Sequence, residues 1–172
     1  LEVFESMTRH LFKEVLNVKL PAKLRQMTWH EAMSKYGSDK PDLRFGMEFV
    51  ELHDLLKGTG EFSIFNSAEY IGGICATGCS SYSRKQINEL TDFVKRPQVG
   101  ASGLIWLKVE EDGSIKSSID KFYSAEILEQ LCERMNAKKG DLVLIMCGEK
   151  PNKTRTQLCA LRLEMAERLG LR

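Results

Sequence analysis

Residues 103–119 have the sequence GLIWLKVEEDGSIKSSI, which predicts a β-hairpin. The run from Gly103 to Val109 is almost continuously apolar, as in a strand that other elements cover. Asp112-Gly113 favours a tight turn between antiparallel strands, and Ser114 to Ile119 then forms the partner strand. A mostly antiparallel sheet is therefore the expected centre of this chain.

The segments around the hairpin complete an α+β pattern. Apolar spacing and capping residues predict further strands at residues 62–65, 70–76 and 141–146, and helices at residues 84–96, from 124 and from 151. From Glu61 onward the order is two ββα units followed by a strand. We therefore expect residues 61–172 to form a two-layer domain, in which helices cover one face of a mostly antiparallel sheet.

The last helix is expected to turn its apolar side inward. Its inner face carries Leu158, Leu161, Met165 and Leu169, and its outer face carries Arg155, Arg162 and Arg168. We therefore expect these three arginines on the side of the helix that faces away from the core.

Residues 1–60 have a different organisation. Residues 1–16 form an amphipathic helix, and its apolar face needs a covering partner in this domain or outside it. Pro21 breaks the segment, and residues 23–27 are expected to form a short strand. Thr28 and Glu31 form a capping box, which predicts a short helix to about Lys35.

A loop with the sequence YGSDKPDLRFG follows at residues 36–46, and we name it the connector. It has neither strand alternation nor helical period, and loops held by rigid elements often carry function. Gly37 favours a left-handed helix end, and Pro41 restricts the residue before it. The side chains of Asp39, Lys40, Asp42 and Arg44 alternate in charge, so they either pair with one another or meet a charged partner; a plain solvated connection is the alternative.

Composition excludes several classes of protein. The chain has 172 residues, with 25 Lys+Arg against 24 Asp+Glu, so it lacks the basic surplus of a general nucleic-acid binder. The five cysteines contain no C-x-x-C pair, which favours buried free thiols in a reducing compartment over a zinc site. No apolar run approaches membrane-spanning length. Because the chain starts without Met and inside a predicted helix, we expect a fragment of a longer protein.

Motifs of catalysis are missing as well. We find no phosphate-binding Gly-rich loop, no nucleophile elbow and no metalloprotease motif, so we expect no catalytic residue and no metal site. Arg84, Lys85, Lys95 and Arg96 give one helix a basic flank. These residues are either a solvated helix face or contacts to phosphates.

The connector also supports a family resemblance. The string YGSDKPDLR at residues 36–44, directly after MTWHEA at 27–32, resembles the signature that follows the second class-defining motif of bacterial-type aspartyl-tRNA synthetases, which are class II enzymes. Five later blocks resemble the GAD insertion domain of the same family: SRKQI at 83–87, GASGLIWLKV at 100–109, IDKF at 119–122, GDLV at 140–143, and ALRL at 160–163 with LGL at 169–171.

The resemblance implies a DCoH-like GAD domain at residues 61–172, preceded at residues 1–60 by a catalytic-domain helix and the connector. It implies a cytoplasmic, homodimeric aspartate–tRNA ligase as parent, which uses ATP and Mg²⁺ to attach aspartate to tRNA(Asp). The fragment itself would be non-catalytic, without a cofactor or a membrane contact, and would lie beside the tRNA acceptor arm and the rest of the synthetase. The implied tRNA contacts are Arg84, Lys85, Lys95, Arg96 and Lys121.

The alternative is a stand-alone interaction or regulatory module of GAD type, as in the B subunit of the tRNA-dependent amidotransferase, which lacks the connector. This chain departs from the family at Met146-Cys147-Gly148 and at Cys159, and both departures concern local packing only.

Overall fold

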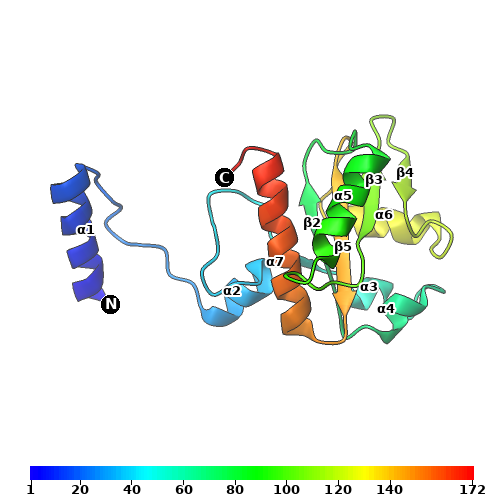
Figure 1. Ribbon diagram of the computed structural model, residues 1–172, viewed down its shortest axis with the longest axis horizontal. Helices are drawn as coiled ribbons and strands as arrows, with labels where there is room; N and C mark the ends of the chain where they lie inside the picture. The colour runs from blue at the N-terminus through cyan, green and yellow to red at the C-terminus, as the bar shows by residue number, and fades with distance from the viewer.

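The computed structural model describes all 172 residues and contains one five-stranded sheet (Figure 1). Its strands are β1 (Val50–Glu51), β2 (Tyr70–Ala76), β3 (Ile105–Val109), β4 (Ile115–Ser117) and β5 (Leu142–Gly148). The strand order is β1-β2-β5-β3-β4, and every pair is antiparallel. The predicted α+β class, the antiparallel sheet and the β3–β4 hairpin are confirmed.

Seven helices surround or precede the sheet. They are α1 (Glu2–Leu16), α2 (Trp29–Tyr36), α3 (His53–Leu56), α4 (Ser63–Ser67), α5 (Arg84–Lys95), α6 (Ala125–Arg134) and α7 (Pro151–Arg168). Local sequence explains where the main ones begin. Ser83 forms a reciprocal capping box with Gln86 at α5, Ser124 caps α6, and Pro151 occupies the start of α7.

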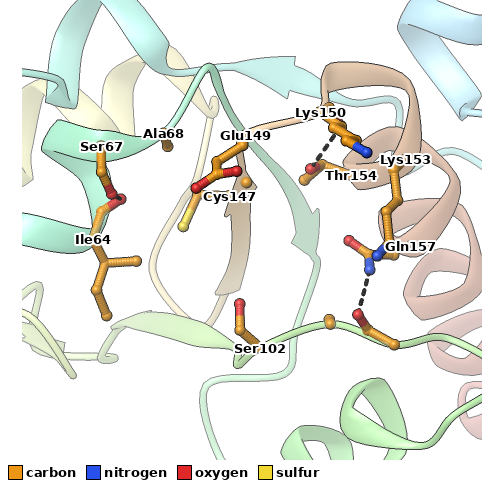
Figure 2. Close-up of a pocket in the computed structure, with 13 residues that line it drawn as sticks. Ile64, Ser67, Ala68, Ser102, Cys147, Glu149, Lys150, Lys153, Thr154 and Gln157 are labelled. Carbon is orange, nitrogen blue, oxygen red and sulfur yellow. Dashed lines mark hydrogen bonds between the residues drawn. The ribbon is translucent and has the colours of Figure 1, made fainter.

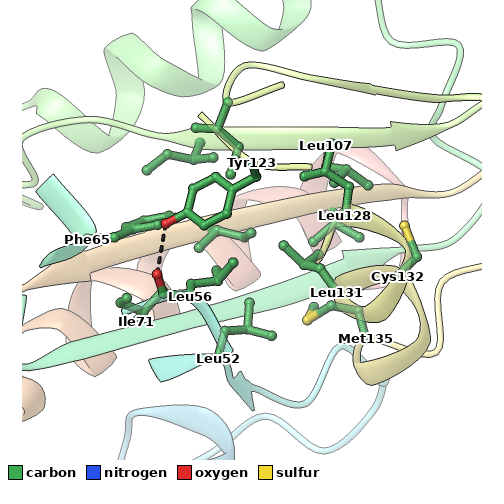
Figure 3. Close-up of a cluster of buried hydrophobic side chains, with 14 of the residues drawn as sticks. Leu52, Leu56, Phe65, Ile71, Leu107, Tyr123, Leu128, Leu131, Cys132 and Met135 are labelled. Atoms are coloured by element: carbon green, nitrogen blue, oxygen red, sulfur yellow. Dashed lines mark hydrogen bonds between the residues drawn. The ribbon is translucent and has the colours of Figure 1, made fainter. Parts of the chain in front are cut away.

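The central strand β5 separates two apolar cores. Leu142, Leu144 and Met146 belong to a core with α5 and α7. Val143 and Ile145 belong to a second core with α3, α4 and α6 (Figure 3), where the Tyr123 hydroxyl donates to the Leu56 carbonyl oxygen at 2.8 Å. Helices therefore cover both faces of the sheet, which differs from the expectation of one covered face. The cause is the unbroken apolar run of β5, because a strand without polar alternation must be buried on both sides.

Two short segments also differ from expectation. Residues 62–65 are part of a helical turn, α4, and not a strand. The spacing of Phe62 and Phe65 explains this, since one turn of helix brings their rings into an edge-to-face contact at 5.0 Å between centroids, and Phe122 packs on Phe62 at the same distance. Residues 23–27 are irregular and pair with no strand.

Helix α1 stands apart from the remainder of the chain (Figure 1), and none of its residues is buried. Its apolar side chains Val3, Phe4 and Val15 are 79%, 69% and 69% exposed. The predicted amphipathic helix is confirmed, and its apolar face is uncovered in this chain. No helix of the structure has the length and apolar content needed to span a lipid bilayer.

All five cysteines are free thiols, and burial raises the pKa of each. The pKa of Cys75 rises to about 12, and those of Cys132 and Cys147 rise to about 11.

Since the thiolate is the reacting form, we expect iodoacetamide at pH 8 to modify Cys132 and Cys147 of the folded chain on the order of 100-fold more slowly than in urea. Mass spectrometry over time measures this, and equal rates in both conditions would contradict it.

Candidate functional site: the connector and its arginine clamp

The connector leaves α2 through Gly37 and lies directly against α7. Gly37 has a φ of 67°, and its N–H donates to the Met33 carbonyl oxygen. A Cβ atom at this position would lie 2.1 Å from the carbonyl oxygen of Arg155. Only glycine satisfies both the left-handed backbone and this contact. The first turn of the connector is therefore fixed by the backbone of α7.

Arg162 of α7 holds the far end of the connector. Its side chain is fully buried, at 0% exposure. The guanidinium donates five hydrogen bonds of 2.8–3.2 Å to four connector-side carbonyl oxygens, those of Asp42, Phe45, Gly46 and Met47. These carbonyls have no strand or helix partners of their own, and the buried guanidinium of Arg162 supplies their hydrogen-bond donors. We call Arg162 with these four carbonyls the arginine clamp.

Aromatic rings cover the charge of the clamp. The guanidinium carbon lies 4.1 Å from the ring centroid of Phe45 and 5.0 Å from that of Tyr36. The Tyr36 hydroxyl donates to a Glu48 carboxylate oxygen at 2.7 Å, which fixes the ring. Burial lowers the pKa of Arg162, but an arginine remains charged at neutral pH. The site thus contains a permanently charged guanidinium that is shielded from solvent by the connector and by two aromatic rings.

The prediction that Arg162 lies on the outer face of α7 was wrong. Arg162 comes four residues after Leu158 and three before Met165, so the helical period places it beside the buried face of α7. α2 and the connector, which lie more than a hundred residues away in sequence, cover this flank of the helix. Arg155, also predicted outside, lies with its guanidinium over the Tyr70 ring at 4.5 Å and 3.6 Å from a Glu51 carboxylate oxygen. No local sequence pattern shows which residues cover a helix from such a distance.

The connector charges pair only in part. Arg44 forms a bidentate ion pair with Asp42, with Nη2–Oδ2 at 2.6 Å and Nε–Oδ1 at 3.0 Å. Hydrogen bonds from Arg44 hold the pKa of the Asp42 carboxyl well below its usual range. Asp39 and Lys40 are exposed and in no ion pair, although the Lys40 N–H donates to the Ser38 hydroxyl at 3.1 Å. Pro41, which follows Lys40, is half-buried. Two exposed charges of the connector are therefore free to meet a partner.

The five predicted tRNA-contact residues are all exposed but do not form one patch. Arg84 and Lys85 lie at the start of α5, and Lys95 and Arg96 lie at its end, roughly 16 Å further along the axis at 1.5 Å per residue. Lys121 lies between β4 and α6, near the opposite face of the sheet. Among the described residues, no group of three or more His, Cys, Asp or Glu side chains has a geometry that holds a metal ion.

Comparison with known proteins matches the chain to one domain family and to a group of similar ligases. The GAD domain family matches residues 63–158. Aspartate–tRNA ligases of Parabacteroides distasonis, Phocaeicola vulgatus and Flavobacterium psychrophilum are 59%, 58% and 49% identical to the chain over all 172 residues. The chain spans 29% of the length of each of these relatives.

Proposed function

We propose that this chain, which belongs to the GAD domain family, is the insertion region of an aspartate–tRNA ligase. The observation that carries the proposal is the 59% identity to such a ligase across every residue of the chain, including α1, α2 and the connector. A relative that shared only a GAD module would leave residues 1–60 unmatched, so the alternative of a stand-alone amidotransferase-like module is not favoured. The boundary at residue 60 remains a prediction, and β1 and α3 already join the sheet and core before it.

In this proposal the parent protein activates aspartate with ATP and Mg²⁺ and transfers it to tRNA(Asp). The residues of this chain do not fit ATP and Mg²⁺, because the sequence has no Gly-rich phosphate loop and the side chains form no metal-ligating cluster. We therefore derive no chemical step here, and we assign the chain a non-catalytic, accessory role beside the tRNA acceptor arm. The parent is proposed to be a cytoplasmic homodimer.

The clamped connector supports this accessory role. It fastens α2 to α7 of the GAD domain through the arginine clamp and the Gly37 contact. A domain joined by such a packed connection holds a fixed orientation, whereas one joined by a flexible linker does not. A fixed orientation is what a domain needs in order to guide a bound tRNA toward a distant reaction centre.

The proposal is tested with the longer protein that contains this chain, using ATP, labelled aspartate and purified tRNA. We expect the label to appear in tRNA(Asp) and to depend on ATP. The proposal fails if the protein charges tRNA with another amino acid or does not charge tRNA at all.

The α5 residues give a second expected result. We expect KM for tRNA to rise by roughly threefold to tenfold when four residues of that longer protein are exchanged for glutamine: Arg84, Lys85, Lys95 and Arg96. The salt dependence of tRNA binding should also weaken, because phosphate contacts release counterions. Aspartate-dependent ATP–pyrophosphate exchange should not change. The exchange of Lys138 and Lys139 for glutamine is the control, and an equal effect for each positive charge removed would show that only net charge matters.

A further inference from the structure

A cavity of about 470 Å³ lies beside the start of α7 (Figure 2). Its walls come from α4, from residues 100–102 and from the turn between β5 and α7. The volume falls within the range of small-molecule sites in proteins. The arginine clamp and α5 contribute no residue to it, so it is separate from the site described above.

The most informative group in the cavity is the amide of Gln157. The residue is only 8% exposed, and its Nε2 donates to the Gly100 carbonyl oxygen at 2.7 Å. That hydrogen bond fixes the orientation of the amide, since a carbonyl oxygen accepts only from the nitrogen. The Oε1 atom is then turned into the cavity without a protein donor (Figure 2). This oxygen is open to the cavity and accepts a hydrogen bond from a ligand that donates one.

Positive charge gathers at the α7 wall of the same cavity. No side chain caps the N-terminus of α7, an eighteen-residue helix, so its first N–H groups and its dipole favour an anion. Lys150 and Lys153 line the cavity, are exposed and form no ion pair. Lys153 is four residues before Gln157 and therefore lies on the same face of α7. This wall is suited to a phosphate group.

A carboxylate that lies beside the lysines disfavours a simple anion as the occupant. Glu149 projects between Ser67 and Thr154 (Figure 2), and its carboxylate repels an anion but accepts hydrogen bonds from hydroxyl groups. Ile64, which is 51% exposed, adds an apolar surface at the outer wall. A nucleotide combines the three required features: a phosphate, donating ribose hydroxyls and a flat apolar face.

We propose that this cavity binds one nucleotide of a single-stranded RNA. The backbone phosphate lies at Lys150 and Lys153, the ribose 2′-hydroxyl donates to Gln157 or Glu149, and the base lies on Ile64. This inference rests on the proposed function, because tRNA supplies the RNA partner, and it adds a defined subsite that the proposed function does not itself require. Single-stranded segments are where proteins recognise RNA most specifically.

The test is an NMR titration of the isotope-labelled chain with the five-nucleotide RNA rA5, the DNA dA5 and inorganic phosphate. We expect rA5 to shift the amide signals of Ile64, Ser102, Lys153 and Gln157, and to bind at least threefold more tightly than dA5, because DNA lacks the 2′-hydroxyl. The double variant Lys150→Gln/Lys153→Gln should bind rA5 about tenfold more weakly. Its log affinity should also fall less steeply with log salt, by about 0.7 for each lost phosphate contact.

The double variant Lys138→Gln/Lys139→Gln is the matched control and should bind as the unmodified chain does. The inference is overturned if phosphate alone produces the same shifts at the same concentration, if dA5 binds as tightly as rA5, or if rA5 leaves the signals of the cavity residues unshifted. Charging of tRNA by the longer protein is measured separately. Intact charging with an unresponsive cavity would therefore refute this inference and leave the proposed function standing.

Discussion

Replacement of Arg162 by methionine is expected to lower the free energy of unfolding by about 3–5 kcal/mol, because it removes a charged hydrogen-bond donor and leaves its carbonyl partners without that donor. Methionine fills much of the same volume but donates no hydrogen bond. Four carbonyl oxygens, at Asp42, Phe45, Gly46 and Met47, lose the donor that satisfies them. Urea unfolding followed by circular dichroism measures the change, provided that both chains unfold in one transition.

Two further variants make this result interpretable. Arg168→Met removes an arginine from the same helix whose partners are the surface carboxylates of Glu164 and Glu89, so it should cost less than about 1 kcal/mol. Arg162→Lys keeps the charge but not the planar fork of donors, so it should recover only part of the loss. If Arg162→Met cost no more than Arg168→Met, the arginine clamp would not hold the connector.

Replacement of Gly37 by alanine is expected to cost about 2–5 kcal/mol, the sum of about 1–2 kcal/mol for a left-handed alanine and about 1–3 kcal/mol for overpacking. The new Cβ would lie 2.1 Å from the Arg155 carbonyl oxygen and 2.7 Å from its carbonyl carbon. Both atoms belong to the backbone of α7, so no side-chain movement relieves the contact. The same urea measurement applies.

Gly58 is the matched control for this prediction. Its φ of 77° is also left-handed, but a Cβ there would meet nothing within 4 Å. Gly58→Ala should therefore cost only about 1–2 kcal/mol, the backbone component alone. Equal losses for both variants would mean that the contact between the connector and α7 contributes nothing to stability.

Much of the fold was predictable because it follows from local sequence. The Asp112-Gly113 turn, the Ser83 capping box and the start of α7 at Pro151 each depend on residues within a few positions. The segment at residues 62–65 was not predictable in this way, since a short apolar run suits a strand and a helical turn equally. The unbroken apolar run of β5 did contain a signal for two covered faces.

The sequence predicted the connector of the candidate site but not its arginine clamp. The connector was identified by its composition and by the family resemblance, and pairing among its charged side chains was one of the alternatives left open; the structure shows the Asp42–Arg44 pair. Arg162 was assigned to the outer face of the last helix, although it comes four residues after Leu158 and three before Met165 and so lies beside the buried face. Its true position depends on contacts between residues 115–120 positions apart, and neither period nor propensity describes such pairs. The cavity beside Gln157 likewise combines three distant segments, so only the structure shows it.

The central claim is that the connector and the GAD sheet form one rigid unit, and native-state hydrogen exchange tests it most directly. The Phe49 N–H donates to the Lys35 carbonyl oxygen at 2.8 Å across the base of the connector, and the Ile74 amide lies inside the sheet. We predict that both amides exchange with opening free energies within about 1 kcal/mol of each other, as members of one cooperative unit do. A Phe49 amide that exchanges at nearly the unprotected rate while Ile74 stays protected would contradict the claim.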